Sequence, residues 1–287
     1  MATVHRLLVF STCFMSGIAA LFGVVSLATE EWITTTSAMW VTLPITLPNT
    51  AKYGLFQGYY SQQGPLVLTI QITMTCLMKE NVCALLCGKD TDARYTLLKE
   101  LYNNNNTADQ DNGNCPTVQR STSYQYNRES IWTYASEDSD DKQFINAGVW
   151  ISTILFLVLS IALGMLSSAL ALWNTVSNPI EIYFSIFGLY IYNAAGLFCS
   201  TLVMLLWGIM HVLITFHNVG IFYTLTGQMT SDKRAYLGYS YWLNLIPIGC
   251  YIYSIAILYV RQYKLSKDPK HQIVQREDRA DPGIYLY

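Results

Sequence analysis

The fold is indicated first by residues 147–173, which have the sequence AGVWISTILFLVLSIALGMLSSALALW. No side chain in this segment is charged, and its length exceeds the roughly 20 apolar residues that a membrane-spanning helix needs. Strands of soluble sheets are much shorter, and a helix satisfies its own backbone hydrogen bonds inside hydrocarbon. We therefore predict that residues 147–173 form a membrane-spanning helix.

Three further segments have the same character, at residues 7–28, 180–213 and 239–260. The composition agrees, since 52% of the 287 residues are hydrophobic and only 13% are charged, against about 25% charged residues in soluble domains. Such a chain cannot cover a surface that faces water, which argues against a soluble enzyme and against a disordered protein. The formal net charge of -2 shows no basic excess of the kind that indicates nucleic-acid binding. The predicted fold class is a membrane all-α four-helix bundle.

A cleaved signal peptide is the alternative for residues 7–28, because Ser26-Leu27-Ala28 resembles a small-residue cleavage site. The apolar run is longer than the h-region of about 7–15 residues that signal peptides contain. We therefore expect a retained span.

Four spans place both chain ends on one side of the membrane and the two longer loops on the other. Basic residues near span ends favour the cytosol. The basic residues near the chain ends are Arg6, Arg261, Lys264, Lys267 and Lys270. They outnumber the basic residues of the second loop, which are Lys233 and Arg234. The expected organisation is a cytosolic N-terminus at 1–6, an extracellular loop at 29–146, a cytosolic turn at 174–179, a second extracellular loop at 214–238 and a cytosolic tail at 261–287.

The large loop contains patterns typical of a folded extracellular domain. From Leu66 to Cys76 apolar and polar residues alternate, which is the period of a half-buried strand. Residues 40–47 and 53–60 are weaker strand candidates, separated by Pro48-Asn49. A helix capped by Asp90 or Thr91 is expected to run through Tyr102. We expect a small extracellular antiparallel β-sheet with one short helix.

Four of the seven cysteines lie in the large loop, namely Cys76, Cys83, Cys87 and Cys115. An even set in an oxidising compartment predicts up to two disulfides. Four cysteines allow three pairings, and the preferred first bridge joins Cys76 to Cys83 or to Cys87. Reduced cysteines that pack as small apolar side chains are the alternative. No histidine lies in the loop, which argues against a zinc site.

Two polar patterns in the large loop suggest modification or ion binding. Asn105-Asn106-Thr107 is a glycosylation acceptor pattern in an Asn- and Asp-rich stretch, so Asn105 is a glycosylation candidate. The acidic run at 137–141 lacks the glycine and the bidentate glutamate of an EF-hand loop. We expect that run to be a solvated face rather than a calcium site.

The spans contain few ionisable residues, so they offer little for catalysis or transport. No phosphate loop, HExxH pair or GxSxG elbow is present, and we expect no enzymatic activity, no cofactor and no metal. Small residues recur at a spacing of four in the spans, as in Ser160-Gly164-Ser168. Such stripes build either the bundle itself, which is favoured, or a dimer contact. Asn193 and Asn244 are expected to hydrogen-bond neighbouring helices.

The organisation resembles the claudin-like tetraspan superfamily, which carries a Trp, then Gly-Leu-Trp, then two cysteines in its first loop. Here Trp32 precedes Gly54-Leu55-Phe56, so Phe56 departs from the claudin pattern. The finer resemblance is to the clarins, through the first-loop motif YGLFQG and the entry to the third span. The residues that carry the resemblance are Trp32, Tyr53, Gly54, Leu55, Phe56, Gly58, Pro179, Glu181, Gly188, Leu189, Tyr190 and Asn193. The first loop is longer than expected for clarins, which indicates a divergent member.

The resemblance implies a claudin-like tetraspan in the plasma membrane that is not an enzyme. It implies an organiser that links membrane domains to actin and scaffold complexes in sensory cells, for mechanosensation or at synapses. The alternative functions are an ion-channel auxiliary subunit and a claudin-like adhesion protein. Expected partners are the lipid bilayer and scaffold proteins, together with another membrane protein or a second copy of the chain.

The chain ends in Tyr285, Leu286 and Tyr287. A carboxyl terminus with large apolar side chains at its last and third-last positions suits the groove of a PDZ domain, where a peptide adds as a strand. An ordinary apolar terminus is the alternative.

Overall fold

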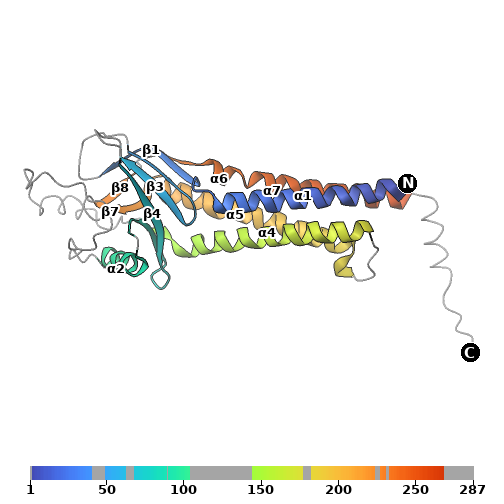
Figure 1. The fold of residues 1–287 in the computed structure, drawn as a ribbon, viewed down its shortest axis with the longest axis horizontal. Coiled ribbons are helices and arrows are strands. Elements are labelled where there is room, and N and C mark those ends of the chain that lie inside the picture. Colours follow the sequence, from blue (N-terminus) through green and yellow to red (C-terminus); the bar gives the residue numbers. More distant parts are fainter. Residues whose placement is uncertain are drawn as a thin grey trace, which may run out of the picture. The chain divides into compact units, whose positions relative to one another are not determined.

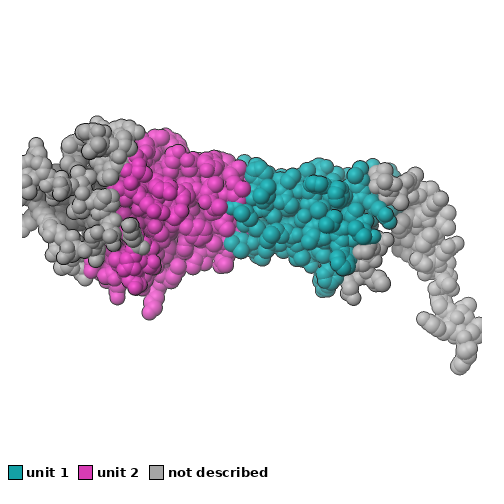
Figure 2. Space-filling model, in the orientation of Figure 1, with its two compact units in different colours: residues 1–24, 158–201, 245–287 teal, residues 25–157, 202–244 magenta. Residues whose placement is uncertain are grey.

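The computed structural model describes residues 2–40, 49–62, 68–88, 90–103, 144–176, 182–223, 227–230 and 233–267. The chain divides into two compact units, which are coloured separately in Figure 2. We call residues 1–24, 158–201 and 245–287 the helical unit, and residues 25–157 and 202–244 the sheet unit.

The long helices labelled in Figure 1 are α1 (Ala2–Ala28), α4 (Ala147–Val176), α5 (Ile186–Met210) and α7 (Leu245–Lys267). A π-helix (His211–Thr215) continues α5, and the short α6 (Tyr239–Trp242) precedes α7. Within the described residues, the segments long and apolar enough to cross a membrane are Arg6–Ala28, Ala147–Val176, Ile186–Thr215 and Tyr239–Lys267.

The surface of these helices suits hydrocarbon. Only 28% to 33% of the most apolar stretch of each segment is buried within the protein. Large apolar side chains such as Leu155 and Phe198 are more than 60% exposed, at 64% and 63%. Contiguous apolar surface of this kind is rare on proteins that face water. The expected membrane spans are thus helices whose outer faces match the bilayer interior.

The third helix begins later than the expected start at residue 180. A 3-10 turn (Ile182–Phe184) precedes α5, and the Asn174 amide at the end of α4 donates to the Phe184 carbonyl at 2.6 Å. A Cβ at Gly188 would lie 2.0 Å from the Tyr183 carbonyl oxygen, so the turn folds tightly against the first turn of α5. Of the expected helical start, residues 182–184 are thus a 3-10 turn, and residues 180–181 lie outside the described residues.

The fourth span is interrupted near its beginning. The break falls at residues 243–244, between α6 and α7, one turn before Pro247. In a continuous helix the Pro247 ring would clash with the Leu243 carbonyl, so the helix has to restart there. At its other end α7 continues to Lys267 rather than ending at residue 260, and carries the basic residues Arg261 and Lys264.

The strands of the sheet unit are β1 (Ile33–Trp40), β2 (Asn49–Tyr53), β3 (Gln57–Gln62), β4 (Leu68–Leu77), β5 (Val82–Leu86), β6 (Ile145–Asn146), β7 (Asn218–Tyr223), β8 (Gly227–Thr230) and β9 (Ala235–Leu237). In the described residues they form a curled sheet in the order β2-β3-β4-β5-β7-β8-β1-β9, with β6 beside β5. The sheet curls because β2 pairs with both β3 and β1.

Both long loops contribute to this sheet. β7 lies parallel to β5 with Leu85 opposite Ile221, and β9 lies antiparallel to β1 with Ile33 opposite Leu237. The sequence analysis assigned the sheet to the first loop alone. β8 and β9 have only four and three residues, too few to show a clear period of two, and the run Ile221-Phe222-Tyr223 in β7 does not alternate between apolar and polar residues.

The predicted alternation in β4 is confirmed, because Ile70 and Ile72 are buried while Gln71 is exposed. The expected strand over residues 53–60 is confirmed for residues 57–60, which lie in β3, and is wrong at its beginning. Tyr53 ends β2, and the Gly54 amide donates to the Gln57 carbonyl at 2.9 Å to close a turn. Residues 41–48, part of another strand candidate, lie outside the described residues.

The short helix α2 (Thr91–Tyr102) follows Asp90, which occupies the N-cap position. Its buried Leu97 and Leu98 pack against Leu77 and Leu86 of the sheet. The described residues thus contain four apolar helices and a curled, mainly antiparallel sheet, and the predicted helix in the large loop covers part of that sheet.

Candidate functional site

Trp32 is the centre of a buried junction in the sheet unit. Its side chain is 0% exposed, and its Nε1 donates to the Ser26 carbonyl at 2.8 Å. The indole packs edge-on against Trp207 and Tyr241, at centroid distances of 5.3 and 6.3 Å. The strand β1 is thereby fixed to the ends of three helices, and we call Trp32, Ser26, Trp207, Tyr241 and Asn244 the Trp32 junction.

Side-chain hydrogen bonds hold the helix ends in this junction. The Ser26 hydroxyl donates to the Ser240 carbonyl at 2.8 Å, and the Asn244 amide donates to the Ser26 hydroxyl at 2.8 Å. The expected bond from Asn244 to a neighbouring helix is confirmed. An amide and a hydroxyl buried in this way are costly unless paired, so the pairing fixes one arrangement of the helix ends.

The first-loop motif forms a second buried connection. Tyr53 is 0% exposed, and its hydroxyl donates to the Val219 carbonyl of β7 at 2.9 Å. Burial raises the pKa of the Tyr53 hydroxyl well above its ordinary value, because the anionic form would lose its hydration. This hydroxyl therefore acts as a neutral donor that joins a first-loop strand to a second-loop strand.

The two glycines of the motif are placed where no larger residue fits. A Cβ at Gly54 would lie 2.5 Å from the Thr29 carbonyl oxygen, and one at Gly58 would lie 2.3 Å from the Lys52 carbonyl oxygen. Leu55 between them is buried. Close backbone approach thus explains both glycines of the motif.

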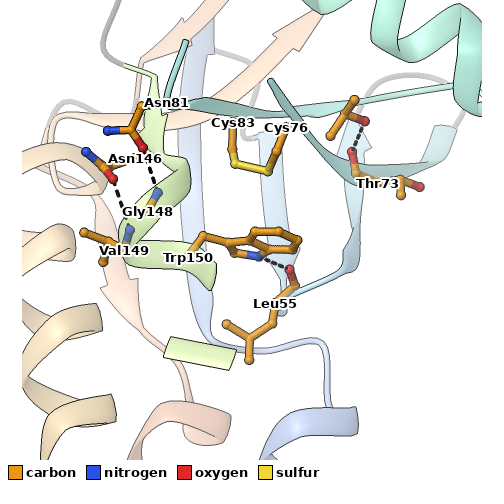
Figure 3. Close-up of a disulfide and its surroundings, with 10 residues drawn as sticks. Leu55, Thr73, Cys76, Asn81, Cys83, Asn146, Gly148, Val149 and Trp150 are labelled. Carbon is orange, nitrogen blue, oxygen red and sulfur yellow. Dashed lines mark hydrogen bonds between the residues drawn. A yellow bond between two sulfur atoms is a disulfide. The ribbon is translucent and has the colours of Figure 1, made fainter. Parts of the chain in front are cut away.

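The same motif contacts the beginning of α4. The Leu55 carbonyl accepts a hydrogen bond of 2.7 Å from Trp150 Nε1, as Figure 3 shows. Phe56 packs edge-on against the Trp150 ring at 6.4 Å and is 45% exposed. Phe56, which departs from the claudin pattern, still makes an aromatic contact at this position.

A disulfide joins Cys76 of β4 to Cys83 of β5, which are opposite each other in the register (Figure 3). This is one of the two pairings preferred from the sequence. Cys87 is also disulfide-bonded. Cys115 and Asn105 lie outside the described residues.

The helical unit contains a line of buried polar side chains, which we call the polar seam; it comprises Ser16, Ser160, Ser167, Asn193, Ser200 and Tyr251. The Ser16 hydroxyl donates to Asn193 Oδ1 at 3.0 Å, and Asn193 Nδ2 donates to the Ser167 hydroxyl at 2.7 Å. The predicted bonding of Asn193 to neighbouring helices is confirmed. One asparagine therefore connects α5 to both α1 and α4.

Tyr251 is the second connection in the seam. Its hydroxyl donates to the Ser160 carbonyl at 2.8 Å, and the Ser160 and Ser200 hydroxyls lie 2.7 Å apart. Cβ atoms added at Gly164 and Gly196 would each lie 2.7 Å from the Tyr251 side chain. The small residues thus make room for a tyrosine within the bundle, which supports the first of the two explanations for the stripes.

The remaining motif residues have different placements. Gly188 allows the tight turn before α5, and Leu189 is buried against Val9 and Leu258. Tyr190 lies partly buried beside them. Pro179, Glu181, the acidic run and the terminal Tyr285, Leu286 and Tyr287 lie outside the described residues.

Sequence reasoning missed several of the connecting residues. Ser16 and Ser167 lie in stretches where other hydroxyls, such as Thr12 and Ser168, give no sign of which one bonds across helices, and Trp207 and Tyr251 look like ordinary span residues. A signal was present in the spacing, since Gly164 and Gly196 mark where a large neighbour has to fit. Among the described residues, no group of three or more His, Cys, Asp or Glu is placed to hold a metal ion.

Four apolar helices, their outward apolar faces and their internally paired polar groups define a multi-pass membrane protein of the tetraspan type. The chain is 32% identical over 107 residues to human clarin-3, an alignment that covers 37% of this chain and 47% of clarin-3. The chain thus spans about half the length of the curated relative it matches. No family model matches the chain. This similarity and the four candidate spans fit a clarin-like tetraspan.

Proposed function

We propose that this chain is a divergent clarin-like, claudin-like tetraspan that organises the plasma membrane of sensory cells. Its sheet unit faces the outside and both termini face the cytosol. It links membrane domains to actin-linked scaffolds, and it performs no enzymatic reaction.

The similarity to clarin-3 is the observation that carries this proposal. Two features of the fold support it. The motif residues Trp32 and Leu55 bond the first loop to helices, and Tyr53 bonds two strands of the sheet to each other, as expected of a rigid extracellular contact domain. The seam residue Asn193 bonds to neighbouring helices, which suits a structural bundle.

The proposed orientation has separate support. More basic residues flank the spans near the chain ends than in the second loop, which favours cytosolic ends. A disulfide in the sheet unit fits an oxidising compartment. Treatment with peptide N-glycosidase is expected to shift the mobility of the full chain but not that of the Asn105→Gln variant. A shift that persists in the variant would place the sugar elsewhere.

Proximity labelling from the cytosolic tail tests the organiser role. The full chain and a chain that ends before Tyr285 are each fused to a labelling enzyme in native sensory tissue. We expect PDZ and actin-linked scaffold proteins to be labelled by the full chain and lost on truncation. Labelling of channel subunits by both chains equally would instead favour the auxiliary-subunit alternative, and cell clustering in naive cells would favour adhesion.

A further inference from the structure

A hollow of about 380 Å³ lies in the sheet unit, and this volume is within the range of about 300–1,000 Å³ for small-molecule sites. Its lining includes Glu30, Glu31, Lys52, Tyr59 and Tyr239. These residues come from the segment between α1 and β1, from β2 and β3, and from the beginning of α6. The first loop and the beginning of the fourth span thus both contribute to one hollow.

The charges in the hollow are of both signs. Lys52 Nζ lies 2.8 Å from Glu31 Oε1, and Gln57 donates to Glu30 Oε1. Within the described residues, Oε2 of each carboxylate makes no side-chain hydrogen bond, and the Lys52 ammonium retains two further donors. With two carboxylates and one ammonium, the hollow carries a formal charge of -1. It can therefore attract a cation and still contact an anionic group.

Two tyrosine rings lie at the same hollow. Tyr59 is 44% exposed and Tyr239 is 51% exposed, so both rings have free surface. The face of an aromatic ring attracts quaternary ammonium groups in particular, which are weakly hydrated. A site made of carboxylates and aromatic faces is therefore expected to bind a quaternary ammonium group more tightly than it binds a primary ammonium group.

The position of the hollow indicates the source of the ligand. Glu30 and Glu31 follow the span that ends at Ala28, and Tyr239 is the first residue of another span. Ends of membrane spans lie at the level of the lipid headgroups. Ligands at this level are lipid headgroups, which are present at far higher concentration than any soluble molecule.

We propose that this hollow binds the phosphocholine headgroup of a membrane lipid. The quaternary ammonium lies against the tyrosine faces and the carboxylates, and the phosphate lies toward Lys52, Thr50 and Ser61. Anionic lipids lack the cation and are repelled by the two carboxylates. The proposal rests on the membrane spans and is independent of the organiser role and of the orientation.

The test uses the full chain in nanodiscs that contain equal parts of dioleoyl phosphatidylcholine, phosphatidylethanolamine and phosphatidylglycerol. The protein is then extracted in mild detergent, and the retained lipids are counted by mass spectrometry. We expect phosphatidylcholine to be enriched over both other lipids. Tyr59→Leu and Tyr239→Leu are each expected to lower that enrichment about two- to five-fold, the effect of losing one exposed cation–π contact.

Matched variants separate binding from folding. Tyr59→Phe keeps the aromatic face and is expected to retain phosphatidylcholine like the parent chain. Tyr95→Leu changes a similarly exposed tyrosine, 48% exposed on α2 and outside the hollow, and is expected to have no effect. Lys52→Met is expected to lower retention of phosphatidylcholine and phosphatidylethanolamine alike, because both carry the phosphate.

Three outcomes would overturn the proposal. Equal retention of all three lipids would show that the tyrosines only anchor the chain at the interface. Preference for phosphatidylglycerol would show that Lys52 dominates. Equal loss in Tyr59→Leu and Tyr95→Leu would show that the enrichment does not arise at the hollow. None of these results bears on scaffold recruitment, which the labelling experiment measures separately.

Discussion

Asn193 on α5 donates a hydrogen bond of 2.7 Å to the Ser167 hydroxyl on α4, and both side chains are fully buried. The same amide group accepts a bond from Ser16 on α1, so three helices share one side chain. Interhelical hydrogen bonds in membranes contribute modestly, on average about 0.6 kcal/mol and up to about 1.7 kcal/mol. A residue that makes several of them is expected to lie at the upper end.

Asn193→Leu is therefore expected to lower the stability of the helical unit by about 1–3 kcal/mol, because it removes the amide that bonds both serines and leaves the buried Ser16 and Ser167 hydroxyls only their contact with each other at 3.2 Å. Thermal unfolding of the purified chain in detergent measures the change. Thr201→Ala is the matched control, since the exposed Thr201 hydroxyl bonds only to Leu197 of its own helix. Equal melting temperatures for the two variants would contradict a structural role of the seam.

Gly196→Ala is expected to destabilise the bundle by about 1–3 kcal/mol, because the added Cβ overlaps the Tyr251 ring. Gly249→Ala, on α7, adds its Cβ to open space and is expected to be neutral or to stabilise by up to about 1 kcal/mol. The two variants make the same chemical change in different helices. A larger loss of stability in Gly249→Ala than in Gly196→Ala would contradict the proposed packing of Gly196 against Tyr251.

Trp32→Phe is expected to lower the stability of the sheet unit by about 1–3 kcal/mol, since the Ser26 carbonyl loses its buried donor while most of the aromatic packing remains. Trp242→Phe changes a tryptophan that is 51% exposed and is expected to have little effect. Limited proteolysis of the sheet unit, followed by identification of the fragments, reads out the difference. Matching cleavage patterns would argue that the indole N–H is dispensable.

Loss of the Cys76–Cys83 bridge by double substitution to alanine is expected to cost about 2–3 kcal/mol, the loop-closure value for a short loop. The bridge itself can be detected in the Cys87→Ala variant, because trypsin cleaves at Lys79 between the two cysteines and Cys83 is then the sole cysteine of residues 80–89. A non-reducing digest is expected to contain the two peptides linked to each other. Separate peptides with free thiols in that digest would refute the bridge.

The buried Tyr53 hydroxyl predicts a loss of stability in alkali. Its pKa is raised in the folded protein, so only the unfolded chain releases the proton above the ordinary value of 10.0. The contribution is therefore fully present below about pH 10 and falls by about 1.4 kcal/mol per pH unit above it. The free energy of unfolding of the Tyr53→Phe variant is expected to fall less steeply over this range, measured by denaturant titrations at several pH values. Parallel curves for the two proteins would rule out this assignment.

The helices could be predicted because a long uncharged apolar run such as 147–173 is favourable only in the hydrocarbon of a membrane, where it has to be helical. The third helix was misplaced because its start depends on a tertiary contact, in which the Asn174 amide holds the Phe184 carbonyl. Nothing in the local sequence there contradicts a helix from residue 180. Long apolar runs are thus determined locally, whereas their ends depend on partners elsewhere in the chain.

Only part of the sheet could be predicted, because some of its strands also depend on partners elsewhere in the chain. β4 has a clear period of two, but β9 has only three residues and is stabilised by its register with β1. The motif glycines were identified, yet their reason appears only in the backbone contacts of Gly54 with Thr29 and of Gly58 with Lys52. The hollow could not be predicted, because its residues come from separate elements that the curled sheet brings together.

The pairing of β1 with β9, and of β5 with β7, sets an order of events during biosynthesis. The ribosome completes the first loop long before it reaches residues 218–237, so β1 and β5 wait with unpaired edges while two further helices are inserted. Exposed strand edges readily bind other chains. Slower insertion of the third helix prolongs that interval, so we expect such variants to aggregate during synthesis more than the stability of the finished protein would indicate.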